Sequence, residues 1–149
     1  YYFTCDDDIV YPKSYVEDTI KKVDKYGLVT YNGRVFASFP IQSFYRDKAK
    51  KYRYARTERK TVEVQFGGTG VMAFDTAYFT IPVSEFQRKN MADVWVGCYA
   101  KRNHYSIWHL AHKKGYLVSQ ETEGSIYETE GDKDAYQAAI INDVFQNTR

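Results

Sequence analysis

Apolar residues between positions 14 and 26 recur every three or four residues, which is the spacing of one helix face: Val16, Ile20 and Val23. Ser14 and Glu17 stand at the start of this stretch in the pattern of a capping box, in which each side chain bonds the backbone N–H of the other residue. Gly27 follows and suits the left-handed backbone at which helices commonly end. The pattern predicts a helix over residues 14–26.

Two later stretches have helical spacing as well. Residues 92–102 would place four side chains on an inner face: Val94, Trp95, Cys98 and Tyr99. Residues 133–146 carry another stripe: Tyr136, Ile140, Ile141, Val144 and Phe145. We expect a helix in each stretch and a loop at residues 119–132, where Ser, Thr, Gly and acidic residues gather.

Alternation and short apolar runs predict the strands. Residues 61–66 alternate strictly between polar and apolar side chains, as a half-buried strand does. Shorter runs predict strands at residues 1–5, which we expect to be buried, at residues 71–74 and at residues 105–110.

Asn32-Gly33 separates two further apolar runs, residues 28–31 and 34–39. Asn-Gly is the strongest short signal for a two-residue hairpin, so we expect these runs to pair. Strands and helices mixed in this order predict an α/β fold, a mixed sheet with flanking helices, in a single domain over residues 1–149.

The composition is that of a folded chain. Hydrophobic residues make up 44% and charged residues 27%, and the net charge of +2 is too small to imply a nucleic-acid partner. No apolar run approaches the roughly 20 residues that cross a bilayer. Cys5 and Cys98 lack the spacing of a metal site and leave room for at most one disulfide, which favours a reducing compartment.

Three consecutive aspartates, Asp6, Asp7 and Asp8, follow the first predicted strand. Adjacent carboxylates raise one another's pKa and become favourable together when a cation lies among them. Mg²⁺ and Mn²⁺ prefer carboxylate oxygens and keep positions for substrate phosphates. On spacing alone, a metal site and a solvated turn that caps the helix at 14–26 are equally good interpretations.

Residues 4–12 read Thr-Cys-Asp-Asp-Asp-Ile-Val-Tyr-Pro, which resembles the D-x-D region of GT-A glycosyltransferases, especially the bacterial family-two-like enzymes. In these enzymes a strand delivers the aspartates and a Tyr-Pro leads into the next helix. The resemblance implies that Asp6 and Asp8 hold Mn²⁺ or Mg²⁺ on the diphosphate of a nucleotide sugar. Asp8 would be the preferred direct ligand, and Asp7 a supporting residue.

Residues 67–74, Gly-Gly-Thr-Gly-Val-Met-Ala-Phe, are similar to the glycine-containing segment of the same enzymes. The similarity implies that Gly68, Thr69 and Gly70 line the donor sugar and the acceptor. Glycine lets backbone approach a ligand closely, although the segment alone also fits a tight turn or bulge between strands.

Residues 91–95, Met-Ala-Asp-Val-Trp, are similar to the acidic catalytic motif of these enzymes, which implies that Asp93 deprotonates the acceptor hydroxyl. The N-terminus of a helix should keep this carboxylate ionised and ready to accept a proton. On position alone, an ordinary helix N-cap is the better interpretation. The order of the three motifs along the chain favours catalysis.

Histidines follow Asp93 in the sequence, and many GT-A enzymes use one there as a further metal ligand. The resemblance implies that His109 or His112 fills this role, and we assign it to His109. A lone histidine is more often structural.

The segment 46–60 has eight Lys or Arg residues in fifteen positions, with Tyr52 and Tyr54 among them. We favour a solvated, variable loop. One alternative is a loop that binds the diphosphate, an anionic acceptor or an acidic membrane surface. Another is a binding site for single-stranded nucleic acid.

As a glycosyltransferase, the chain would be a partial GT-A (nucleotide-diphospho-sugar transferase) fold. It would form the acceptor-side, C-terminal part of a larger domain whose nucleotide-binding half precedes Tyr1. The implied reaction is metal-dependent, inverting sugar transfer from a nucleotide-sugar donor, a UDP-sugar above all, to a carbohydrate acceptor in bacterial surface polysaccharide synthesis. We expect no nucleic-acid partner, and a location in the cytoplasm or peripherally at the inner face of the membrane. The alternative function is a non-catalytic, truncated domain that binds carbohydrate or a partner protein.

Overall fold

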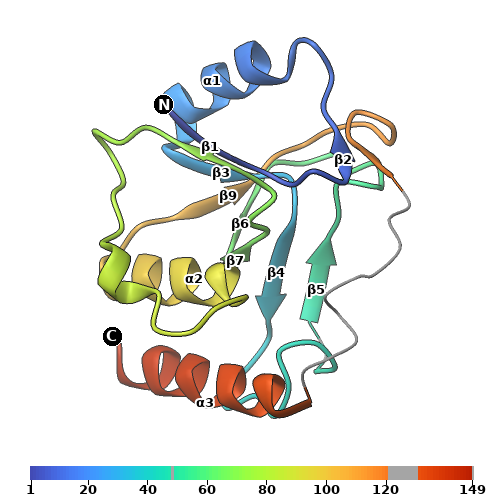
Figure 1. Cartoon of the computed structure of the whole chain (residues 1–149). Coiled ribbons are helices and arrows are strands. Elements are labelled where there is room, and N and C mark those ends of the chain that lie inside the picture. The colour runs from blue at the N-terminus through green and yellow to red at the C-terminus, as the bar shows by residue number, and fades with distance from the viewer. Residues whose placement is uncertain (48, 121–130, 149) are drawn as a thin grey trace.

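The computed structural model describes residues 1–47, 49–120 and 131–148 (Figure 1). At its centre is a five-stranded sheet with the order β1-β8-β3-β9-β6. The strands are β1 (Tyr2–Cys5), β8 (Val71–Phe74), β3 (Leu28–Thr30), β9 (Ile107–His109) and β6 (Val62–Val64). β3 and β9 are parallel and the other neighbours antiparallel, so the predicted mixed sheet is confirmed.

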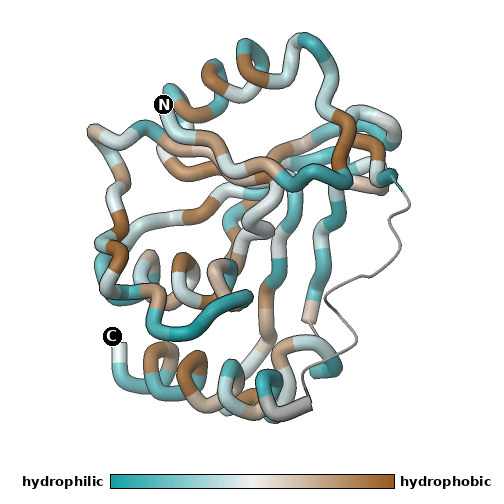
Figure 2. Tube along the Cα trace, viewed as in Figure 1, coloured by the Kyte–Doolittle hydropathy of each residue, from teal (hydrophilic) through white to brown (hydrophobic). Residues whose placement is uncertain are grey.

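Successive strand residues point to opposite faces of this sheet, and helices cover both faces. α1 (Tyr15–Tyr26) packs on the face that carries Val29, and α2 (Ala92–Arg102) packs on the face that carries Leu28. α3 (Gly131–Asn147) lies against α2 and not on the central sheet (Figure 1). Both α2 and α3 carry brown, hydrophobic positions along their tubes (Figure 2), and side chains of both helices belong to one buried cluster.

A second sheet of three strands, in the order β5-β4-β7, stands beside the first. Its strands are β5 (Ala49–Tyr52), β4 (Gly33–Phe36) and β7 (Phe66–Gly67), and α2 packs on β7. The remaining elements are a short ribbon of β2 (Ile9–Val10) with β10 (Val118–Ser119), and a 3₁₀ turn, η1 (Val83–Glu85).

The three predicted helices are confirmed, and so are the strands at residues 71–74 and 105–110. α1 ends at Gly27, whose φ is +81°, as predicted. The capping box is wrong, because Ser14 makes no side-chain hydrogen bond to the helix. The backbone of Ser14 is already helical, and the Tyr15 N–H is satisfied by the Pro12 carbonyl oxygen at 2.9 Å.

The predicted hairpin at Asn32-Gly33 is also wrong, because β3 and β4 belong to different sheets. The Asn32 carbonyl accepts a hydrogen bond from the Gly68 N–H, and the Tyr31 N–H donates to the Val71 carbonyl. Pairing with distant residues therefore outweighs the local turn signal, and the chain crosses here from one sheet to the other.

Three further expectations meet the structure only in part. Residues 61–66 are divided between β6 and β7, in two sheets, rather than forming one strand. β1 is an edge strand and not a buried one, because only β8 pairs with it, and Tyr2 is 53% exposed. Residues 121–130 of the predicted loop lie outside the described residues, while β10 and the start of α3 occupy its two ends. Of the described helices, none has the length and apolar character to span a membrane.

Candidate active site

The register of the central sheet brings Asp6 beside Gly70. β1 and β8 run antiparallel with Cys5 opposite Val71, so the next residue after β1 lies next to the last residue before β8. The approach is so close that a Cβ atom on Gly70 would collide with the Asp6 carboxyl group. Two of the three predicted motifs therefore meet at one edge of the sheet, where glycine permits this close approach.

Tyr11 holds this meeting point together. Its hydroxyl donates to the Gly70 carbonyl oxygen at 2.5 Å and accepts from the Asp6 N–H at 2.9 Å. Burial raises the pKa of Tyr11 to about 12, so the hydroxyl keeps the proton that it donates. The sequence pattern places Tyr11 only at the approach to a helix, and nothing in it indicates this bridge.

The aspartates at this edge repel one another. Burial raises the pKa of the Asp6 carboxyl, and the neighbouring charges of Asp8 and Asp7 raise it further. None of the three caps α1, whose N-cap residue is Ser14. A divalent cation would relieve the repulsion, and Mg²⁺ commonly binds one or two carboxylates together with substrate phosphates. Asp6 and Asp8 are the residues at this edge that could hold such a cation, with substrate phosphates as its other ligands.

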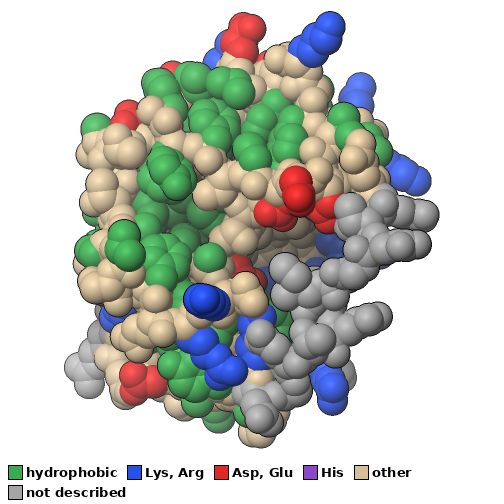
Figure 3. All heavy atoms as spheres, in the orientation of Figure 1, with side chains coloured by type: hydrophobic (Ala, Val, Ile, Leu, Met, Phe, Trp, Pro, Cys, Tyr) green, Lys and Arg blue, Asp and Glu red, His purple; other side chains and the backbone are tan. Residues whose placement is uncertain are grey.

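A pocket of about 540 Å³ lies on the other side of the glycine segment, between the three-stranded sheet and the start of α2. Gly67, Gly68 and Asp93 are among the residues that line it. The space-filling view shows a hollow with acidic side chains above it and basic side chains within it (Figure 3). Gly68 and Gly70, two residues apart, therefore connect the pocket to the Asp6 edge.

Packing against β7 positions Asp93. Gly97, one helical turn further along α2, lies so close to Phe66 that a Cβ atom there would collide with the ring. The start of α2 is thereby held next to Gly67. Asp93 is the second residue of the helix and not its N-cap, which is Met91, so the N-cap interpretation does not hold.

The charge state of Asp93 differs from the expectation. Burial raises the pKa of its carboxyl, while the Val94 N–H, 3.0 Å from Oδ1, and the Arg34 guanidinium oppose the rise without cancelling it. The sequence argument considered only the helix terminus, and here desolvation is the larger effect. A carboxylate with a raised pKa is a stronger acceptor for a proton from a hydroxyl group.

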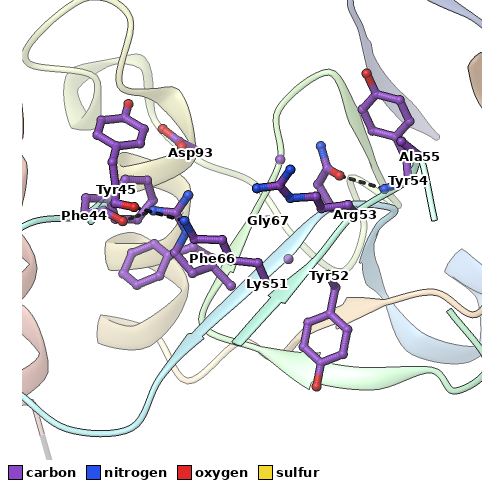
Figure 4. A pocket seen from close by; sticks show the side chains of 14 residues that line it. Phe44, Tyr45, Lys51, Tyr52, Arg53, Tyr54, Ala55, Phe66, Gly67 and Asp93 are labelled. Carbon is purple, nitrogen blue, oxygen red and sulfur yellow. Dashed lines mark hydrogen bonds between the residues drawn. The ribbon is translucent and has the colours of Figure 1, made fainter. Parts of the chain in front are cut away.

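The basic segment contributes directly to the pocket, which the favoured interpretation as a solvated loop missed. Lys51 and Arg53 line the pocket, whereas the ring of Tyr52 points to the other side of the strand (Figure 4). This is the alternation expected of a strand, and β5 ends at Tyr52. The hydrophobic pattern of the segment has no clear period because the paired stretch is only four residues long.

His109 lies at the buried side of Tyr52. Its side chain is fully buried, with the Tyr52 ring stacked at 4.9 Å and the His112 ring at 5.5 Å between centroids. Burial, helped by His112, lowers the pKa of His109 to about 4, so the imidazole is neutral at pH 7. Within the described residues no three His, Cys, Asp or Glu side chains are grouped to hold a metal, so Asp6, Asp8 and His109 do not form a three-ligand site.

Thr69 joins the two halves of the site in sequence, between Gly68 in the pocket and Gly70 at the acidic edge, and its side chain is partly exposed. The sites predicted at residues 6, 68–70 and 93 are thus brought to neighbouring positions. A scan against protein-family models and a search of curated proteins each found no match to the chain, so its candidate chemistry rests on this arrangement of residues.

Proposed function

We propose that this chain is the acceptor-side part of a metal-dependent glycosyltransferase, with a nucleotide sugar as donor and a carbohydrate as acceptor. The observation that carries the proposal is the contact of Asp6 with Gly70 at one end of a glycine segment whose other end, Gly67 and Gly68, shares a pocket with Asp93. Three motifs that are far apart in the sequence thereby border one region. A partial GT-A fold is the architecture that this function implies.

The two acidic positions would take different parts in the reaction. Asp6 and Asp8 would hold Mn²⁺ or Mg²⁺, and the ion would neutralise the charge that builds on the leaving diphosphate. Asp93 would accept the proton of the acceptor hydroxyl while the oxygen of that hydroxyl bonds to the anomeric carbon of the donor sugar. The diphosphate would depart with the electron pair of the broken bond, from the face opposite the attack, so the configuration inverts.

The pocket suits a saccharide acceptor in size and lining. Small-molecule pockets commonly measure roughly 300–1,000 Å³, and this one measures about 540 Å³. Tyr45 and Tyr54 contribute aromatic side chains to its lining, and such faces pack well against sugar rings. Gly68 adds backbone that a ligand can approach closely.

Replacement of Asp93 by Asn tests the proposal. Asn keeps the shape of the side chain but cannot take up a proton, so transfer from UDP-sugars to an oligosaccharide acceptor should fall by about 10²- to 10⁴-fold. Mn²⁺-dependent binding of UDP should stay unchanged. Glu63→Gln, an exposed carboxylate on β6, is the control and should leave transfer intact.

Transfer at the normal rate by the Asp93→Asn variant would contradict the assignment of the base. Saccharide binding without transfer by the unsubstituted chain, in the presence of its nucleotide-binding half, would instead support the non-catalytic alternative.

A further inference from the structure

Three basic side chains line the Asp93 pocket: Arg34 from β4, and Lys51 and Arg53 from β5 and its end. β4 and β5 are antiparallel with Arg34 directly opposite Lys51, so cross-strand register places these two cations together. In Figure 4 the Arg53 side chain extends from its strand toward the side on which Asp93 lies. The pocket thus carries more positive than negative charge among its lining residues.

Arg34 is already occupied within the protein. Its guanidinium donates a hydrogen bond to the Phe44 carbonyl and stacks on the Phe44 ring, 4.1 Å from the centroid. Its positive charge also lowers the pKa of Asp93, against the effect of burial, so part of that charge is balanced by the candidate base. We therefore count Arg34 as the partner of Asp93 and not as a ligand-binding cation.

Neither Lys51 nor Arg53 forms an ion pair with a carboxylate in the described part of the chain. The Lys51 ammonium donates to the Tyr45 carbonyl at 3.0 Å, which leaves further N–H donors. Partial burial lowers the pKa of Lys51, and the like charges of Arg34 and Arg53 lower it further.

We propose that Lys51 and Arg53 bind an anionic group of the acceptor, a carboxylate or a phosphate, inside the Asp93 pocket. The inference rests on the proposed function and makes the acceptor an acidic saccharide. A neutral sugar would leave two adjacent cations without compensation, whereas an anion accepts hydrogen bonds from both, and the arginine fork matches carboxylate and phosphate oxygens. Arg53 would orient the anionic group through paired hydrogen bonds, and Lys51 would add positive charge.

The test compares glucose derivatives that carry an anionic group with a neutral one built on the same ring. Methyl glucuronide and glucose 1-phosphate, each against methyl glucoside, are titrated into the chain by calorimetry at low and at moderate salt. We expect the charged sugars to bind at least about tenfold more tightly, the effect of one charged hydrogen bond, and to lose part of this advantage in salt. The two charged sugars distinguish carboxylate from phosphate as the natural group.

Two pairs of variants localise the effect. Lys51→Gln and Arg53→Gln should each reduce the preference for the charged sugar by about tenfold. Lys50→Gln, whose ammonium lies over the Tyr52 ring, and Arg56→Gln, on an exposed turn, should leave it unchanged. All four side chains are exposed, so the variants should fold alike, and their thermal unfolding midpoints verify this.

Equal binding of charged and neutral sugars, no binding of either, or a preference that survives in both pocket variants would overturn the inference. The proposed function fails separately. If Asp93→Asn abolishes transfer to a neutral acceptor that the unsubstituted enzyme uses fully, the transferase stands and only the anionic acceptor is wrong. If Asp93→Asn has no effect while the charge preference depends on Lys51 and Arg53, the pocket binds anions but the transferase is wrong.

Discussion

Asp6 and Asp93 are both carboxylates with a raised pKa, and the comparison of their surroundings separates their roles. At Asp6, burial acts together with the like charges of Asp8 and Asp7. At Asp93, burial is opposed by the Val94 N–H and by Arg34. Repulsion among carboxylates is relieved by a cation, whereas a single desolvated carboxylate is relieved by a proton.

The two sites also differ in shape. Asp6 lies at the end of an edge strand, where its carboxyl packs against Gly70 while much of the residue stays open to solvent, so that a large, hydrated ligand such as a diphosphate can approach. Asp93 is partly buried in a pocket beside basic side chains. The same side-chain chemistry thus stands in two different settings, which suit the metal and the proton transfer of the proposed reaction respectively.

The largest expected effect is a difference in Mn²⁺ affinity between variants at Asp6 and Asp8 and a variant at Asp93. Asp6→Asn combined with Asp8→Asn should weaken Mn²⁺ binding in the presence of UDP by at least about a hundredfold, since the loss of a residue that only supports a metal ligand already costs about 10- to 100-fold. Asp93→Asn should leave it unchanged. Electron paramagnetic resonance of free Mn²⁺ measures both affinities, and Asp7→Asn is the matched neighbour, with a smaller loss.

If Asp93→Asn weakens Mn²⁺ binding as much as the paired substitution does, Asp6 and Asp93 do not have separate roles, one in metal binding and the other in proton transfer. The comparison above would then be wrong.

A methyl group at Gly70 should give an intermediate effect. Gly70→Ala pushes against the Asp6 carboxyl, which can swing away, so we expect Mn²⁺ affinity to fall by about tenfold while the free energy of unfolding changes little. Gly115→Ala is the control, for which we expect the opposite result: a loss of stability without a change in Mn²⁺ affinity. It adds a methyl group in open space at a φ of +84°, and should cost about 1 kcal/mol of stability without changing Mn²⁺ affinity.

Unchanged Mn²⁺ binding in Gly70→Ala would show that the position of Asp6 does not matter for the metal.

The smallest expected effect is on the free energy of unfolding, and its size depends on pH. Because folding raises the pKa of Asp93, its protonated form contributes stability that is fully present below the unfolded pKa and lost as the pH rises through the folded pKa. Asn resembles the protonated carboxyl, so Asp93→Asn should stabilise the protein at pH 7 by about 1 kcal/mol. The gain should vanish near pH 3.

Urea unfolding at both pH values measures this, with Glu63→Gln as a control that should show no change at either. Destabilisation of Asp93→Asn at pH 7 would mean that Arg34 and Val94 stabilise the carboxylate more than burial penalises it.

The sequence predicted the helices well because their periodicity is local. The bounds of α2 at residues 92–102 agree with the prediction, and they place Asp93 in the first turn. The strand partners were not predictable in this way. Asn32-Gly33 signals a hairpin locally, yet the neighbouring backbone bonds to Gly68 and Val71, nearly forty residues away along the chain.

The site was predicted in part for the same reason. Motifs identified Asp6, Gly70 and Asp93, but not the pocket wall, since a run of Lys and Arg looks the same whether it is solvated or lines a cavity. Pairing of β5 with β4 decides that Lys51 lies beside Arg34. The Tyr11 bridge likewise depends on the β1–β8 register and has no local signature.

The most direct measurement follows Mn²⁺ through its paramagnetic broadening of backbone amide signals in the ¹H–¹⁵N spectrum, with UDP present and Mg²⁺ as the diamagnetic reference. The account predicts the strongest broadening at Asp6 and Gly70, clear broadening at Gly68 and Asp93, and none of it after Asp6→Asn with Asp8→Asn. Broadening that centres elsewhere, or that reaches Asp6 but spares Gly68 and Asp93, would contradict the proposal that the metal at Asp6 and the base at Asp93 border one region.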